Sequence, residues 1–116
     1  MKAPAPGLSH LRVTLSESAY IGPGRADILA LIAETGSIAE AAKRMAMSYK
    51  RAWGLVQALN EGFGAALVET TRGGKEQGAT LTPTGAEVLA RYRSMQQKTR
   101  DAIASDVAAL TKLIRK

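Results

Sequence analysis

The side chains in this chain that are best suited to chemistry are polar, basic and aromatic groups gathered around residues 48–57. Arginine and lysine can pair with guanine in the major groove of DNA, and glutamine can pair with adenine. The start of a helix also favours phosphate, because its first amides have no partner within the helix. These residue types predict contacts with double-stranded DNA, and the candidate contact residues are Ser37, Ser48, Tyr49, Lys50, Arg51, Trp53 and Gln57.

The sequence lacks the usual residues of a catalytic or metal site. It contains no cysteine, which excludes disulfides and thiolate zinc or iron–sulfur sites. His10 is the single histidine and lies in a polar stretch, so no histidine base for a nucleophile is visible. The glycines at 73, 74 and 78 have neither the lysine spacing nor the strand-to-helix context of a nucleotide-binding loop. We therefore expect no enzyme, no metal site and no cofactor.

A short helix is expected to precede the candidate contact residues. Ser37 and Glu40 form the S-x-x-E of a capping box, in which a serine and a glutamate satisfy each other's amides at a helix start. Gly36 suits the left-handed residue that ends the helix before it. The buried face of the short helix recurs at helical spacing and consists of Ile38, Ala41, Ala42 and Met45.

The candidate contact residues themselves are expected on a second helix, at about residues 49–61. Ser48 caps this helix, after a turn in which Met47 is buried. Most of the contact residues fall away from its apolar face, which again recurs at helical spacing and consists of Ala52, Leu55, Val56 and Leu59. Two helices in this arrangement predict a helix-turn-helix, whose second helix enters the major groove.

Each of these side chains also has a purely structural explanation. Lys50 and Arg51 by themselves could be an ordinary solvated pair, because basic residues are common on helix surfaces. Trp53, the only tryptophan, is more often a packing residue than a base contact. The segment that follows shifts the balance toward DNA.

A basic hairpin is expected to follow the second helix. Residues 67–71 and 79–81 form two short β runs, and the glycines between them allow positive φ. A helix-turn-helix followed by such a hairpin is a winged helix, and wings commonly contact phosphate. A mobile surface hairpin is the alternative. The wing residues assigned to DNA binding are Arg72, Gly73, Gly74 and Lys75.

The remaining N-terminal elements complete a mainly α member of the α+β class. Residues 1–10 are expected to form a flexible arm, and residues 11–82 the winged helix-turn-helix domain. Leu11, Val13 and Leu15 alternate with polar residues, which predicts a third strand for a small antiparallel wing sheet. A helix at about 25–34 follows a Pro–Gly break.

Residues 83–116 are expected to form a long helix that makes a homodimer. Thr82 and Pro83 suit a helix start, and thirty helical residues would span about 45 Å. A helix folded back on its own domain is the alternative, because Thr99 and a stutter near Val107 weaken the seam. The predicted dimer interface recurs at threes and fours and consists of Leu89, Tyr92, Thr99, Ile103, Val107, Leu110 and Ile114.

Length and charge agree with a DNA-binding domain. The chain of 116 residues is long enough for one domain, and 16 basic against 10 acidic residues give a net charge of +6. No signal-peptide pattern or long apolar stretch is present, so we expect a cytoplasmic protein without a membrane contact. Between residues 43 and 75 the charges are Lys43, Arg44, Lys50, Arg51, Arg72 and Lys75 against Glu61 and Glu69.

Residues 24–85 resemble the N-terminal DNA-binding domain of the ModE family of molybdenum-responsive transcriptional regulators, itself similar to the winged helix of LysR-type regulators. The matching runs are TGSIAEAAKRMAMSYKRAW and LVETTRGGKEQGATLTPTG. The resemblance implies a bacterial or archaeal dimer whose recognition helix starts at Ser48 and whose linker helix, after Thr84, forms the dimer contact. Full-length members also carry C-terminal molybdate-binding domains, and nothing in this sequence resembles their SARN-type anion motif. Molybdate binding is therefore not carried over, and we expect a stand-alone regulator that has lost the sensor or uses a separate oxyanion or metal sensor partner.

The sequence thus predicts a transcriptional regulator, linked to molybdenum metabolism, that binds an inverted repeat as a homodimer. Two other classes remain open. A non-specific architectural DNA-binding protein would need only the basic face, and it would show a steep salt dependence and no operator. A winged-helix protein-interaction module would bind another protein and shift no duplex.

Overall fold

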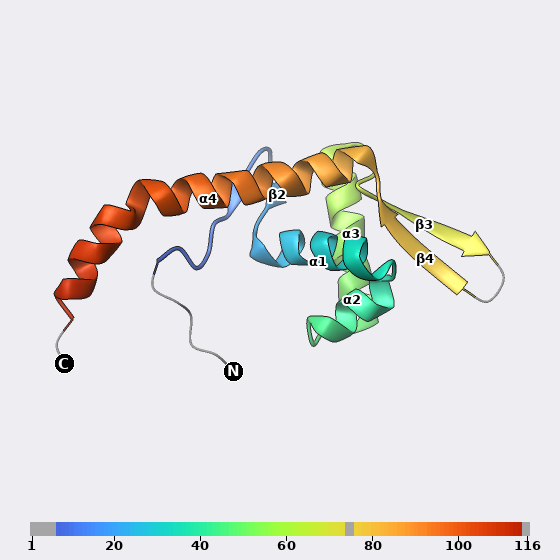
Figure 1. The fold of residues 1–116 in the computed structure, drawn as a ribbon. Helices are drawn as coiled ribbons and strands as arrows, with labels where there is room; N and C mark the ends of the chain where they lie inside the picture. The colour runs from blue at the N-terminus through green and yellow to red at the C-terminus, as the bar shows by residue number, and fades with distance from the viewer. Residues whose placement is uncertain (1–6, 74–75, 115–116) are drawn as a thin grey trace.

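The computed structural model describes residues 7–73 and 76–114. The elements, in order, are β1 (Val13–Thr14), β2 (Tyr20–Ile21), α1 (Pro23–Thr35), α2 (Ile38–Arg44), α3 (Tyr49–Phe63), β3 (Val68–Gly73), β4 (Glu76–Leu81) and α4 (Pro83–Lys112). Helices α1 to α3 pack together, the β3–β4 hairpin projects from one side, and α4 crosses the domain and extends far beyond it (Figure 1). The mainly helical winged helix predicted from the sequence is confirmed.

The core lies where α1, α2 and α3 meet the base of the wing. Alanines at the centre of α2 and α3 are almost completely buried, which lets these helices approach closely. Fully burying one aliphatic side chain contributes about 1.5–3 kcal/mol, so this cluster supplies most of the driving force. The buried cluster consists of Ile21, Ala26, Ile28, Leu29, Ile32, Ile38, Ala41, Ala42, Ala52, Val56, Leu59, Leu67, Val68, Ala79 and Tyr92.

Local chemistry sets the helix ends much as the sequence predicts. Gly36 adopts a left-handed conformation, with φ 72°, at the end of α1. The Oγ of Ser37 accepts a hydrogen bond from the amide of Glu40 at 3.1 Å, and the Oγ of Ser48 accepts one from the amide of Arg51 at 3.1 Å. Only this half of the Ser37 capping box is observed in the described structure, where the carboxylate of Glu40 instead pairs with Lys43.

The predicted three-stranded wing sheet is wrong. In the described residues β1 pairs with β2, and β3 pairs with β4 in a separate sheet, both antiparallel. The hydroxyl of Ser16 accepts from the amide of Ala19 at 3.1 Å, which helps to fold the first strand back on the second. The wing offers no free edge at this point, because the amide of Ala79 donates to the carbonyl of Gly36 at 2.9 Å.

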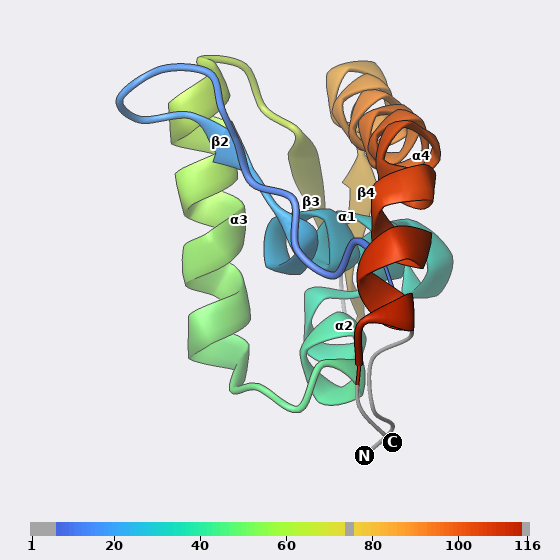
Figure 2. The same ribbon diagram turned by 90° about the vertical axis from the view of Figure 1, so that its left-hand side faces the viewer.

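The β1–β2 hairpin lies against the C-terminal half of α3, on the same side of the domain as α4 (Figure 2). Gly62 of α3 permits this contact, because a Cβ there would collide with the carbonyl of Ser18. A similar close approach fixes the start of α4, where a Cβ on Gly85 would overlap the backbone of Leu67. Both contacts join segments that are far apart in the chain.

Helix α4 has two parts with different surroundings. Its first half packs on the domain and buries Tyr92, whose hydroxyl donates to the carbonyl of Leu11 at 2.6 Å. Tyr92, which the sequence placed on the dimer seam, therefore belongs to the core of its own subunit. The last turns leave the domain, and Leu110 is 64% exposed. None of the described helices has the length and apolarity needed to cross a membrane.

Candidate nucleic-acid interface

The first turn of α3 presents the residues that the sequence proposed for DNA contact. Ser48 caps the helix, and Tyr49, Lys50 and Arg51 follow it on the surface. Neither Lys50 nor Arg51 takes part in an ion pair within the described residues. Two adjacent unneutralised cations at a helix N-terminus form a local positive field that suits an anionic polymer.

The opposite face of α3 anchors this surface to the core. Ala52, Val56 and Leu59 are buried, which fixes the rotation of the helix about its axis. Leu55, predicted to share this face, is only half-buried. Gln57 is half-buried as well and lies nearly two turns beyond Lys50. A rigid helix that holds cations on one side can place them against base edges with little loss of side-chain freedom.

Trp53 lies at the surface, stacked on Tyr49. The two ring centroids are 6.4 Å apart and the ring planes differ by 12°. Trp53 remains 37% exposed and Tyr49 48% exposed. Trp53 is therefore not part of the buried core, although most of its side chain is covered.

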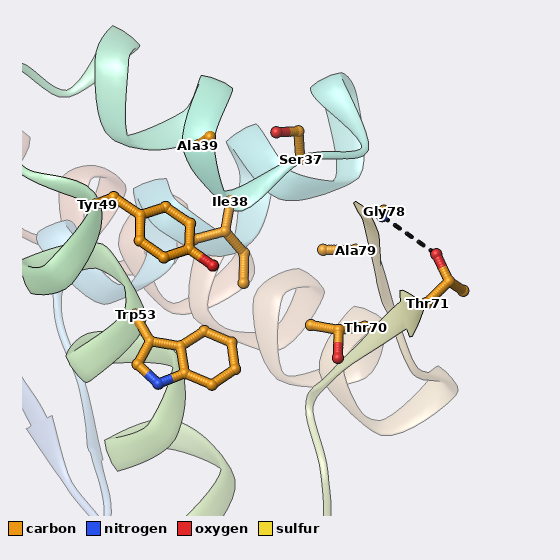
Figure 3. Close-up of a pocket in the computed structure, with 9 residues that line it drawn as sticks. All are labelled: Ser37, Ile38, Ala39, Tyr49, Trp53, Thr70, Thr71, Gly78 and Ala79. Carbon is orange, nitrogen blue, oxygen red and sulfur yellow. Dashed lines mark hydrogen bonds between the residues drawn. The ribbon is translucent and has the colours of Figure 1, made fainter. Parts of the chain in front are cut away.

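A cleft separates the aromatic pair from the wing. It has a volume of about 240 Å³, and it is lined by Ser37, Ile38, Ala39, Tyr49, Trp53, Thr70, Thr71, Gly78 and Ala79. Figure 3 shows the two rings on one side and the wing residues on the other, with Ile38 between them. The sequence analysis included Ser37, Tyr49 and Trp53 among the contact residues but missed the other six, because only the docking of the wing on α1 brings them together.

The wing lines one side of this cleft and projects from the domain (Figure 1). Arg72 pairs with Gln77 and Gly73 with Glu76 in the register of its two strands. Gly74 and Lys75 lie outside the described residues, and so does the side chain of Arg72. The role in phosphate contact assigned to the wing therefore remains a prediction.

Two of the basic residues counted toward this face are neutralised by their own domain. Lys43 pairs with Glu40 at 3.5 Å, and Arg44 pairs with Glu34 at 3.1 Å. Both pairs are exposed, so each adds little to stability. The positive character of the described part of the face thus depends on Lys50 and Arg51.

A second basic cluster, which the sequence analysis did not identify, lies on the β1–β2 side of the domain. The guanidinium carbons of Arg12 and Arg25 each lie 3.7 Å from the ring centroid of Tyr20. Such contacts stabilise a cation over an aromatic face. No sequence signal joins these residues, because the β1–β2 hairpin creates the contact. Among the described residues no group of three or more acidic, histidine or cysteine side chains could hold a metal ion.

Comparison with known proteins agrees with this geometry. Residues 25–86 match the family described as bacterial regulatory helix-turn-helix proteins, lysR family. The chain is 43% identical over 79 residues to the molybdenum-pterin-binding protein MopB of Rhodobacter capsulatus, which covers 67% of this chain and 29% of the relative. It is 35% identical over 102 residues to the DNA-binding transcriptional dual regulator ModE of Escherichia coli K12, which covers 84% of this chain and 39% of the relative.

A further relative is the molybdenum transport protein ModE of Herbaspirillum seropedicae, 44% identical over 72 residues, with 61% of this chain and 27% of the relative covered. The chain therefore spans less than half the length of these relatives. The resemblance to ModE-type regulators that the sequence motifs indicated is confirmed for this N-terminal part.

Proposed function

The chain belongs to the lysR family of bacterial regulatory helix-turn-helix proteins, and from this membership we propose that it regulates transcription by binding a specific DNA sequence as a homodimer. The observation that carries the proposal is the first turn of α3, where Lys50 and Arg51 are exposed and unneutralised. The family is one of regulators, so the function is binding rather than catalysis.

In the proposed complex α3 enters the major groove. Lys50, Arg51 and Gln57 contact base edges, where arginine and lysine read guanine and glutamine reads adenine. The amides at the starts of α2 and α3, beside Ser37 and Ser48, approach backbone phosphates. The proposed wing contacts, Arg72 to Lys75, orient the protein on the backbone without reading sequence.

The distal part of α4 is the proposed dimer contact. Ile103 and Val107 are half-exposed, and Leu110, Leu113 and Ile114 are between 64% and 76% exposed. An apolar stripe on a helix that has left its domain favours burial against a second copy. Half-buried Thr99 lies nearer the domain on the proposed contact, whereas Tyr92 and Leu89, both predicted at the dimer interface, pack in or against the core of their own chain. A two-fold dimer predicts an inverted repeat with half-sites about 34 Å apart or a multiple of this.

We also propose that the regulated genes belong to molybdenum metabolism, because the relatives carry molybdenum in their names. A separate oxyanion or metal sensor partner is the proposed source of any response to molybdate.

The test is selection of bound genomic fragments, with and without molybdate, followed by titration of selected and random duplexes at about 150 mM salt. We expect the selected fragments to share an inverted repeat and to bind at least about 1,000-fold more tightly than random duplex. Equal affinity for both would contradict sequence-specific regulation and favour an architectural role. Failure to bind any duplex, together with capture of another protein, would favour an interaction module.

A further inference from the structure

The aromatic pair on α3 is the feature that DNA binding by Lys50 and Arg51 leaves unexplained. Tyr49 and Trp53 are one helical turn apart, and each keeps more than a third of its surface exposed. Large aromatic side chains are usually buried, because leaving their apolar area in water is costly. The two rings are nearly parallel and together form one wall of the cleft.

The floor of the cleft is apolar, and its opposite wall combines two threonines with Gly78 and Ala79. Ile38 lies between the rings and the wing and is 5% exposed, and Ala79 lies on the wing side and is 2% exposed (Figure 3). None of the nine lining residues carries a charge. Two of the polar side chains in the lining have partners, since the hydroxyl of Thr71 accepts from the amide of Gly78 at 3.2 Å and that of Ser37 accepts from the amide of Glu40.

This chemistry selects the kind of DNA group that fits. A phosphate needs cations or several amide donors, which the lining of the cleft does not offer. In the major groove the four base pairs present hydrogen-bonding groups and one apolar group, the 5-methyl of thymine. The cleft opens beside the first two turns of α3, the part of a recognition helix that meets base edges.

We propose that this cleft reads thymine by its 5-methyl group, with Tyr49 and Trp53 as the aromatic wall and Thr70 and Ala79 on the wing side. The inference rests on the proposed DNA binding and adds a base preference to it. Cytosine and uracil lack the methyl group, so the cleft disfavours both. The wing then contributes to sequence readout as well as to phosphate contact.

The experiment replaces each thymine of the selected duplex, one at a time, with deoxyuridine, which removes only the methyl group. We expect one thymine in each half-site to lose about four-fold in affinity, the ratio that corresponds to burying one methyl-sized group. Replacing the same thymine–adenine pair with cytosine–guanine lowers affinity, and 5-methylcytosine recovers about four-fold relative to cytosine.

Two variants assign the effect to the cleft. Trp53→Ala is expected to bind the thymine and deoxyuridine duplexes equally, whereas Trp53→Phe keeps a ring and keeps most of the discrimination. Lys50→Ala is the matched control on the same turn, and it should weaken binding but retain the discrimination. Thermal unfolding of each variant checks the fold, and a scan of the unaltered protein that finds no sensitive thymine overturns the proposal even if Trp53→Ala does not fold.

The outcomes separate this inference from the proposed function. Tight binding of the selected duplex with no sensitive thymine overturns the thymine reading and leaves sequence-specific binding intact. A sensitive thymine that stays sensitive in a folded Trp53→Ala variant also overturns it, because another group must then contact the methyl. If no duplex is bound specifically, the proposed function fails and the thymine reading fails with it.

Discussion

The first turns of α3 and the last turns of α4 both expose large apolar side chains, but in different settings. On α3 the exposed rings of Tyr49 and Trp53 are stacked on each other, beside cations and a cleft. Leu110 near the end of α4, and Leu113 and Ile114 directly after it, are exposed where the helix has left its domain. Partly exposed rings beside cations suit contact with DNA, whose surface is polar with a few apolar groups. Exposed apolar residues along a helix suit a second copy of the same helix.

The largest expected effect comes from a charge on the α4 stripe. Val107→Asp would bury a carboxylate in the proposed dimer contact, so the protein should become monomeric. Affinity for the inverted repeat should fall by about 100-fold, because the two half-sites are then bound independently. Sedimentation and duplex titration measure both changes. Ser105→Asp, on the other side of α4, is the control, and a Val107→Asp variant that stays dimeric would show that α4 is not the contact.

Removal of a cation from α3 tests whether the start of this helix contacts DNA. Arg51→Ala should cost about 1–3 kcal/mol in binding and relax the preference at one base pair, if Arg51 pairs with a base. The dimer should be unchanged. Arg91→Ala removes an equally exposed arginine from α4 and should leave affinity unchanged. An equal loss on all sequences would instead mean that Arg51 contacts phosphate.

The proximal half of α4 should affect stability rather than binding. Tyr92→Phe removes the hydrogen bond to the carbonyl of Leu11 and should lower the free energy of unfolding by about 1 kcal/mol. Urea unfolding measures the change, and DNA affinity of the folded dimer serves as the control. An unchanged unfolding midpoint would mean that water replaces the hydroxyl at this carbonyl.

The same tyrosine predicts an alkaline effect. Burial raises the pKa of Tyr92 above 10.0, so the folded state keeps its proton where the unfolded chain has lost it. The resulting stability is complete below pH 10 and is lost as the pH rises through the folded pKa. The free energy of unfolding, measured between pH 8 and about 11, should fall in the unaltered protein and fall less in Tyr92→Phe. Parallel curves of unfolding free energy against pH for the two proteins would argue against the burial effect.

The smallest effect on stability and DNA affinity is expected at Lys43, which the sequence analysis counted with the basic DNA-binding face. Lys43 pairs with Glu40 on the surface of α2, so Lys43→Ala should change stability by less than about 0.5 kcal/mol. Its DNA affinity and salt dependence should match those of the unaltered protein. A shallower salt dependence would show that Lys43 leaves Glu40 to contact phosphate.

Much of the fold follows from signals that span four residues or fewer. Gly36, Ser37, Ser48 and Thr82 mark helix ends by their own backbone and side-chain chemistry, and apolar spacing identifies the buried faces of α2 and α3. These signals can be recognised in the sequence because the groups that interact are close together in the chain.

Only part of the candidate site could be predicted from the sequence, because some of its residues are neighbours in the chain and others are not. The basic and aromatic residues at the start of α3 are adjacent in the chain, so their grouping is visible in the sequence. The cleft is not, because its walls come from α2, α3 and the two wing strands. Exposure of Trp53 likewise depends on what the neighbouring elements leave uncovered.

The sequence by itself therefore determined the helices, the hairpin and the family. Only the tertiary structure decided the pairing of β1 with β2, the burial of Tyr92 in its own subunit and the opening of the cleft beside Trp53. Strand pairing depends on which edges remain free, and burial depends on which distant segments arrive. Both are properties of packing between elements, which no local pattern of residues specifies.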